Sequence, residues 1–234
     1  MTRRPNRREF LHQSGTLSTA VLVGLGSTVP ALAQNKKEKQ TEEVSPAEDL
    51  MREHGLLNRL LLIYQEHLRL ISTQSEFDPG VLSDAAGIVR RFVEDYHEKL
   101  EENYLFPRFH KAGKLVDLVN TLQQQHETGR RVTATIQQLA VPGAVKDQNR
   151  LSQISEALQS FLRMYRPHEA REDTVLFPEF KKIVSPHEYA SLGDDFEKKE
   201  DELFGEDGFF KVVDQVAALE KKLGIYELAQ FTPK

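Results

Sequence analysis

The chain has 234 residues, of which 39% are hydrophobic, and this is the composition of a globular protein with room for one domain and its extensions. The absence of cysteine excludes disulfides, thiolate metal ligands and a cysteine nucleophile. The formal charge is 31 − 36 = −5, so the chain lacks the basic surface that non-specific nucleic-acid binding needs, and we expect no nucleic-acid partner.

The first 33 residues have the order of a secretory signal, with a basic start, a weakly apolar stretch and small residues at the end. Four arginines and one glutamate give this segment a charge of +3, whereas the other residues carry 31 − 4 = 27 basic and 36 − 1 = 35 acidic groups, a net of −8. The run NRREFL at residues 6–11 resembles a twin-arginine signal, which the export system for folded proteins reads. We therefore expect a cleaved Tat signal peptide over residues 1–33, a flexible leader over residues 34–44, and a periplasmic or otherwise exported protein.

A membrane-anchoring helix is the alternative interpretation of this start. The apolar run is short and interrupted by glycine, which is unfavourable for a stable span. We expect no stable membrane span after the signal has been cleaved.

Helical periodicity begins at Ser45, which with Glu48 forms a capping box. Apolar residues and histidines then recur at steps of three and four in four segments, separated by turns near residues 75–80, 110–114 and 141–147. Short connections between amphipathic helices favour antiparallel neighbours. This pattern predicts an all-α fold, an up-down four-helix bundle.

The two halves of the bundle resemble each other, since residues 97–109 align without gaps on residues 168–180. Both stretches contain Leu-Phe-Pro, and we expect the second helix to end near Phe106-Pro107 and the fourth near Phe177-Pro178. Pro167 lies within the fourth helix and predicts a local kink just before His168.

The bundle is expected to span residues 45–182, followed by a C-terminal helical extension over residues 183–234. A second capping box begins at Ser185, and a last helix is predicted from about Gly208 to Leu223. These helices either pack against the bundle or contact a partner subunit in a homo-oligomer.

Each helix of the bundle carries one histidine on its apolar seam, and these are His54, His97, His126 and His168. In an up-down hairpin, residues equidistant from the turn lie side by side, and the midpoints of successive histidines fall in or near the predicted turns. The four imidazoles should therefore occupy one layer of the interior. Glu101 follows the second histidine by four residues and Glu172 follows the fourth by four, so each lies one turn along the same face.

Burying four imidazoles and two carboxylates without compensation would cost several kcal/mol. A bound cation removes this cost, and pairing with Arg130, Arg131 or Arg171 is the competing solution. Imidazole and carboxylate without thiolate suit iron, manganese or zinc, and six ligands are too many for one tetrahedral zinc.

The pattern thus predicts two ions bridged by the two carboxylates. One ion would be held by His54 and His97 and the other by His126 and His168, with both glutamates spanning the pair.

Over residues 45–182 the sequence resembles the hemerythrin-like family (the HHE cation-binding domain), whose members are four-helix bundles with a non-haem di-iron centre. The resemblance rests on the ordered set His54, His97-x-x-x-Glu101, His126 and His168-x-x-x-Glu172, together with the two Leu-Phe-Pro endings. It implies two carboxylate-bridged iron ions, with manganese or zinc less favoured, and the binding, sensing or scavenging of dioxygen, nitric oxide or another diatomic ligand.

The sequence departs from the oxygen-carrying members of this family, which have a fifth histidine one turn after the third. Arg130 stands at that position here, and Glu172 replaces an aspartate that the carriers have one residue later, where this chain has Asp173. Water, or an inward shift of Glu98 or Glu169, would fill the missing place. An open position favours reaction with oxygen, nitric oxide or peroxide over stable reversible carriage.

Two further tyrosines are of interest, because Tyr104 and Tyr165 fall on the seam and are able to donate a hydrogen bond to a bound ligand, although core packing explains them equally well. The remaining histidines are predicted to lie outside the cluster: His12, His67, His110 and His187.

An enzyme of the di-iron oxidase or peroxidase type, or an iron-handling protein, is the alternative function. Ferritin-like oxidases need a Glu-x-x-His pair on each of two helices. This chain has only Glu94-x-x-His97, with Tyr165 in the matching place of the fourth helix. We therefore expect a metal- and ligand-binding protein with no assigned catalytic residue, and a purely structural metal site is the third interpretation.

Overall fold

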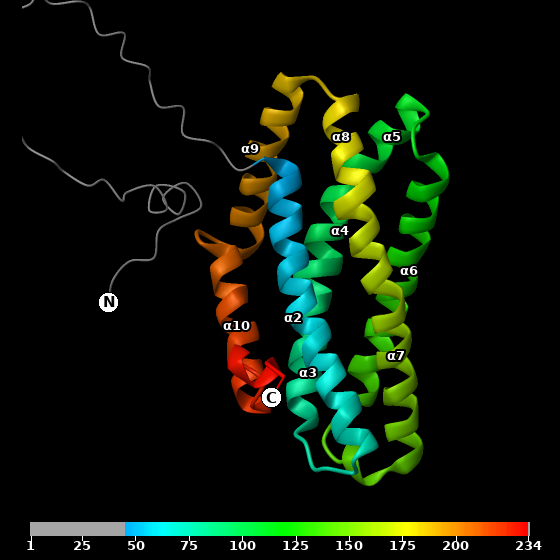
Figure 1. Cartoon of the computed structure of the whole chain (residues 1–234), viewed down its shortest axis with the longest axis vertical. Helices are drawn as coiled ribbons and strands as arrows, with labels where there is room; N and C mark the ends of the chain where they lie inside the picture. Colours follow the sequence, from blue (N-terminus) through cyan, green and yellow to red (C-terminus); the bar gives the residue numbers. More distant parts are fainter. Residues whose placement is uncertain (1–44, 234) are drawn as a thin grey trace, which may run out of the picture. The chain divides into compact units, whose positions relative to one another are not determined.

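The computed structural model describes residues 45–233, and every regular element in this range is helical (Figure 1). The chain divides into two units, residues 1–44 and 45–234, so the described residues belong to the second unit. The predicted signal peptide and leader lie outside the described residues. Within the described range, no helix combines the length and the apolar character that a membrane span requires.

The first helix, α2 (Pro46–Ser72), begins at the predicted capping box. The Ser45 hydroxyl accepts a hydrogen bond from the Glu48 backbone N–H at 3.3 Å, and the Glu48 carboxylate accepts one from the Ser45 N–H at 3.0 Å. These two bonds satisfy backbone donors that a helix start leaves without partners. Its buried face includes Leu50, Leu57 and Leu61, which lie at the predicted helical spacing.

The second helix is a continuous rod built from five consecutive elements: α3 (Pro79–Ile88), the π-helix η2 (Val89–His97), α4 (Glu98–Leu100), the π-helix η3 (Glu101–Leu105) and α5 (Phe106–Ala112). The fourth has the same plan, with α7 (Gln148–Arg171), the π-helix η5 (Glu172–Leu176) and α8 (Phe177–Ile183).

The prediction that these helices end at Phe106-Pro107 and Phe177-Pro178 is therefore wrong. Pro107 and Pro178 each stand in the first turn after a wide π-helical segment, a position where a missing N–H costs little, so the chain continues as a helix. The second rod stops instead at Gly113, whose φ of 63° ends the helix. Pro167 lies inside α7, which continues through it to Arg171, and the kink stays a prediction.

The four long helices pack as the predicted up-down bundle. The third, α6 (Val116–Leu139), packs against α7, α7 also packs against α2, and α6 contacts α3 and η2 of the second rod. The interior is filled by large apolar side chains, including Tyr64, Phe92, Phe106, Phe161 and Phe177. The predicted all-α, up-down four-helix bundle is confirmed.

The C-terminal extension forms α9 (Pro186–Phe204), α10 (Gly208–Leu223) and the short 3₁₀ helix η6 (Leu228–Phe231). Figure 1 shows α9 and α10 on one flank of the bundle, where both contact α2. A two-pronged ion pair fastens α10, since the Arg59 guanidinium meets the Glu220 carboxylate at 2.9 and 2.5 Å. Within the described chain, these helices thus pack against the bundle itself, which was one of the two predicted arrangements.

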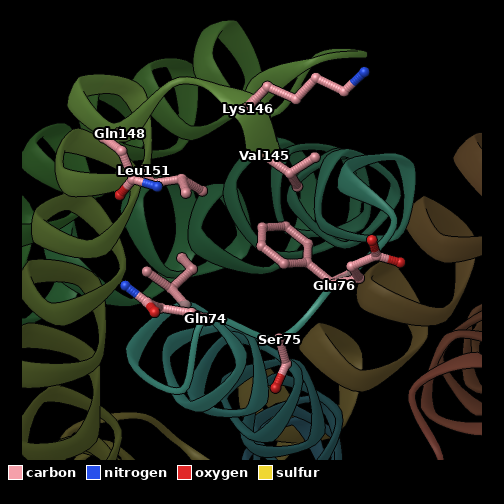
Figure 2. A pocket seen from close by; sticks show the side chains of 9 residues that line it. Gln74, Ser75, Glu76, Val145, Lys146, Gln148 and Leu151 are labelled. Carbon is pink, nitrogen blue, oxygen red and sulfur yellow. The ribbon is translucent and has the colours of Figure 1, made fainter.

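A cavity of about 420 Å³ lies between the loop after α2 and the loop before α7 (Figure 2). Its walls combine apolar Val145 and Leu151 with charged Glu76 and Lys146. Ile71, another lining residue, is 71 − 54 = 17 residues beyond His54 on α2, which corresponds to about 25 Å along a helix. The cavity is therefore separate from the histidine layer.

Candidate metal centre

The four predicted histidines meet in one layer of the bundle interior, each at most 3% exposed. The Nε2 atoms of His54 and His97 are 3.0 Å apart, and those of His126 and His168 are 3.2 Å apart. One pair therefore bridges α2 and η2, and the other bridges α6 and α7. The predicted common level of the imidazoles is confirmed.

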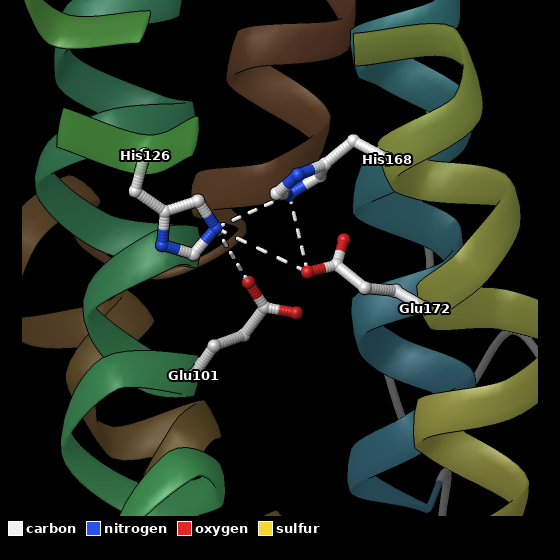
Figure 3. Close-up of side chains that lie close together, drawn as sticks. All are labelled: Glu101, His126, His168 and Glu172. Atoms are coloured by element: carbon white, nitrogen blue, oxygen red, sulfur yellow. Dashed lines mark hydrogen bonds and ion pairs between the residues drawn. The ribbon is translucent and has the colours of Figure 1, made fainter. Parts of the chain in front are cut away.

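The Glu172 carboxylate faces one histidine pair in Figure 3, which draws it beside His126 and His168, and it also contacts His54 of the other pair. Its Oε2 is 3.4 Å from His54 Nε2, and its Oε1 is 3.1 Å from His168 Nε2 and 4.0 Å from His126 Nε2. One carboxylate thus faces histidines of both pairs.

Glu101 occupies the corresponding position on the second rod. Its Oε2 is 3.4 Å from His126 Nε2 and 3.9 Å from His97 Nε2. The possible ligand atoms form two overlapping groups, each with its atoms within 4.8 Å of one another: Glu101, His126, His168 and Glu172, and His54, His97 and Glu101. Both carboxyl groups are fully buried, so each needs compensation for its charge when it is ionised.

The second nitrogen of each imidazole is held by a side chain from another helix. The Nδ1 distances to the accepting oxygens are 2.7 Å for His54 to Asp173, 2.7 Å for His97 to Glu53, 3.2 Å for His126 to Glu102 and 2.8 Å for His168 to Gln125. In a neutral imidazole, an oxygen acceptor at Nδ1 places the ring hydrogen there and leaves an unprotonated Nε2 facing the centre. Such orienting partners are typical of metal-binding histidines.

These four partners were missed by the sequence analysis as functional residues. Each is the direct chain neighbour of a cluster residue: Glu53 precedes His54, Glu102 follows Glu101, Gln125 precedes His126 and Asp173 follows Glu172. Their adjacency was a signal, but the histidine that each contacts lies on a different helix, and this depends on how the helices are rotated about their axes.

The oxygens of Glu101 and Glu172 show that these residues fit a cation. Among the described residues, none of these four atoms has a hydrogen-bond partner apart from the imidazole nitrogens that converge on them. Facing nitrogen lone pairs and buried carboxylates repel one another in an apolar interior, and a cation among them reverses this repulsion.

The competing arginine pairing is not seen. Arg130 contacts Glu98 and Glu102 at 2.7 and 2.5 Å instead of the two central glutamates. Arg131 donates to Thr128, and Arg171 is exposed. The donor set of the layer therefore suits metal cations.

Burial and neighbouring groups shift the pKa values of these side chains in different directions. Burial lowers the pKa of His126 to about 4 and that of His97 well below the usual value, so both imidazoles are neutral near pH 7. Burial also raises the pKa of Glu101 far above that of an ordinary carboxyl, and the nearby charge of Glu172 adds to this. For His54, burial lowers the pKa, but hydrogen bonds to Asp173 and Glu172 outweigh it and raise the pKa.

The Leu-Phe-Pro endings place an aromatic ring on one histidine of each pair. Phe177 stacks on His54 with 5.5 Å between ring centres, and Phe106 stacks on His126 at the same distance. Both rings are almost fully buried and cover the layer from the α5 and α8 side. They exclude water from the imidazoles and restrict their rotation.

The inward shift of Glu98 or Glu169 stays a prediction, although possible ligand atoms of Glu98, Glu102 and His126 already lie within 4.8 Å of one another. Glu98 accepts hydrogen bonds from the Tyr165 hydroxyl and from Arg130, both at 2.7 Å, and Glu169 accepts one from Asn58 at 2.5 Å. Burial raises the pKa of Glu98 to about 8 and that of Glu169 to about 7. The two carboxyls thus border the layer without facing its Nε2 atoms.

The two tyrosines that were predicted to lie beside the cluster occupy different places in the structure. Tyr165 lies beside the layer, with its ring 5.4 Å from that of His168. Tyr104 is only half-buried and packs against Phe196 of α9, so it is not brought to the cluster. His67 is likewise outside the cluster, buried near the loop after α2 with its Nδ1 donating to the Ile63 carbonyl.

The sequence model of the family described as the hemerythrin HHE cation binding domain matches residues 45–144. Three relatives are each 41% identical over 231 residues, covering 97% of this chain and 91% of the relative: the uncharacterized proteins Rv1995 and MT2051 of Mycobacterium tuberculosis and Mb2018 of Mycobacterium bovis. No solved structure matches the chain. Beyond residue 144, α7 and η5 complete the cluster with His168 and Glu172. Over residues 45–144 the chain therefore contains a hemerythrin HHE cation-binding domain, and the cluster of histidines and glutamates lies at the centre of its bundle.

Proposed function

We propose that the protein binds two iron ions in the histidine layer and that this pair binds a diatomic ligand, dioxygen or nitric oxide, in sensing, binding or scavenging. One observation carries the proposal. The Nε2 atoms form two separate pairs, with internal distances of 3.0 and 3.2 Å, and each central carboxylate faces both pairs. Two bridged ions use all six side chains, whereas one tetrahedral ion would leave buried ligands without a partner.

In this assignment His54 and His97 hold one ion, and His126 and His168 hold the other. Glu101 and Glu172 bridge them. Imidazole and carboxylate donors without thiolate suit iron, with manganese and zinc as less favoured occupants. The ferrous pair would supply electrons and an open coordination position to a small ligand.

The surrounding chain supports this chemistry by orientation and exclusion. The four Nδ1 partners hold the imidazoles in fixed tautomers, and the phenylalanine rings of Phe106 and Phe177 limit the access of water. Arg130, at the position of the carriers' fifth histidine, is engaged by Glu98 and Glu102 and offers no ligand atom. The coordination position that lacks a fifth histidine favours reaction with oxygen, nitric oxide or peroxide over stable carriage.

The alternative, a di-iron oxidase or peroxidase, has less support. Glu94 of its Glu-x-x-His pattern is buried but pairs with Arg90 at 2.5 Å and belongs to none of the ligand groups. We therefore favour a metal- and ligand-binding protein over an enzyme. Turnover assays with peroxide and with a reducing co-substrate distinguish the two.

Metal analysis tests the proposal directly. Protein purified under reducing conditions should contain two iron ions per chain, and its optical spectrum should change when air or nitric oxide is admitted. A stoichiometry of one, or a spectrum that is the same with and without these gases, would contradict it. A long-lived oxygen adduct that dissociates on degassing would instead indicate reversible carriage.

We also propose export by the twin-arginine pathway, which the residue order of positions 1–33 supports. Export of a folded chain suits a metal centre assembled in the cytoplasm. Replacing Arg7 and Arg8 together by lysine in the full chain should keep the protein in the cytoplasm, and unchanged export would contradict the proposal.

A further inference from the structure

The turn between α9 and α10 packs against the back of one histidine pair. Phe204, the last residue of α9, lies edge-on to the Tyr96 ring at 5.4 Å and tilted against Phe92 at 5.5 Å. Tyr96 and Phe92 both belong to the π-helix η2, which ends at His97. Residues outside the four-helix bundle therefore contact the segment that carries a candidate metal ligand.

Tyr96 links this turn to the histidine layer through Glu53. Its hydroxyl donates a hydrogen bond to Glu53 Oε1 at 3.0 Å, while Glu53 Oε2 accepts from His97 Nδ1 at 2.7 Å. Tyr96 and Glu53 are both almost fully buried. Because one carboxylate makes both contacts, a displacement of the Tyr96 ring alters the position of the oxygen that orients His97.

The turn itself is tightly built. A Cβ on Gly208 would lie 2.6 Å from the Phe204 Cβ, so only glycine allows α10 to start this close to α9. The Glu200 carboxylate accepts a hydrogen bond from the Phe209 backbone N–H at 2.7 Å. The Arg52 guanidinium, one residue before Glu53, lies 4.5 Å from the centre of the Phe209 ring. The turn is thus a closely packed support that also contacts α2 through Arg52.

Within residues 45–233, only the His54–His97 side of the layer has this support. In the repeat, Pro167 corresponds to Tyr96, and the Nδ1 partner of His168 is the neutral amide oxygen of Gln125. His126 has the Glu102 carboxylate at 3.2 Å, whereas His54 and His97 both have carboxylate partners at 2.7 Å, Asp173 and Glu53. A carboxylate on Nδ1 makes an imidazole a stronger ligand than an amide does.

We propose that the C-terminal hairpin, formed by α9, α10 and the turn between them, positions Glu53 on His97 through Phe204 and Tyr96. This makes the His54–His97 pair the tighter of two unequal cation sites. This rests on the proposed function in that it assumes two bound cations. Phe204 and Tyr96 are positioning residues, and neither contacts the cation.

The test loads the full chain with Co²⁺ and follows its release to an excess of chelator, which needs no activity. The wild type should release cobalt in two phases, and His54→Ala should abolish the slow one while His168→Ala abolishes the fast one. Tyr96→Phe keeps the ring and loses only the hydroxyl, and it should accelerate the slow phase about 10-fold, the lower end of the range known for the orienting partners of metal ligands. Phe204→Ala should do the same.

Leu219→Ala is the matched control, since it empties a buried position of α10 that lies outside the Phe204–Tyr96 contact. It should leave both phases unchanged, and thermal unfolding of the metal-free variants reports whether each is folded. An unchanged slow phase in both Tyr96→Phe and Phe204→Ala would overturn the proposal. A wild type that binds one cobalt would overturn the two-ion function, while the release rate of that single ion in Tyr96→Phe would still decide whether the hairpin positions His97.

Discussion

The Tyr165 hydroxyl occupies the space that a side chain at position 129 would need, since a Cβ on Gly129 would lie 2.0 Å from that oxygen. Glycine in the middle of α6 weakens the helix intrinsically, so its presence there needs a reason. The reason is the close approach of Tyr165, whose hydroxyl donates to Glu98 at 2.7 Å beside the histidine layer.

Gly129→Ala should therefore displace Tyr165 and break its bond to Glu98. We expect a loss of about 1–3 kcal/mol in the free energy of unfolding, the typical cost of overpacking, measured by denaturant titration of the metal-free protein. Gly55 offers a matched control, because it is exposed on α2 and nothing lies within 4 Å of a Cβ there. Gly55→Ala should stabilise the protein by about 0.5–1 kcal/mol. Equal effects of the two substitutions on the free energy of unfolding would show that the Tyr165 side chain moves aside without a measurable cost.

Removing a bridging ligand should affect both ions, whereas removing a terminal one should affect mainly one. Metal analysis of Glu101→Ala should give clearly less than one iron per chain, while His126→Ala or His168→Ala should retain about one. Glu127→Ala, an exposed neighbour of His126, is the control and should keep two. A normal iron content in Glu101→Ala would contradict the bridging assignment.

The same glutamate should have opposite effects on stability with and without metal. In the metal-free protein Glu101 is a buried carboxylate facing Glu172, so Glu101→Gln should raise the free energy of unfolding by about 1–3 kcal/mol. In the metal-loaded protein the wild type should be the more stable of the two, because cation binding stabilises the folded state. The variant should therefore have the higher melting temperature without metal, and the wild type should have the higher melting temperature with metal. The same order in both states would argue against a cation at Glu101.

Stability in acid should depend on His67, which lies far from the layer. Burial lowers its pKa below the ordinary value of 6.5, so the folded state binds its proton less readily than the unfolded state. Stability is then lost as the pH falls below 6.5. His67→Phe keeps a ring beside Phe77 and should flatten the fall in unfolding free energy between pH 6.5 and pH 5. An identical slope in the variant would mean that His67 binds its proton as readily in the folded protein as in the unfolded chain.

Much of the site was predictable because helices are periodic. The spacing of His54, His97, His126 and His168 relative to three short turns was enough to place four imidazoles in one layer, and the four-residue step to Glu101 and Glu172 was enough to add the carboxylates. The helix ends were not predictable in this way. A proline after a π-helical segment removes no hydrogen bond that the helix needs. The local residue pattern does not predict the π-helix.

The sequence by itself thus determined the fold class and which six side chains share the interior, since these follow from apolar periodicity and ligand order. Only the tertiary structure decided what supports them. Whether Glu53 orients His97, whether Arg130 pairs with Glu98 or with Glu101, and whether Phe204 reaches Tyr96 all depend on the rotation and axial offset of one helix against another. Those variables are fixed by side-chain packing between segments far apart in the chain, which the period of a single helix does not contain.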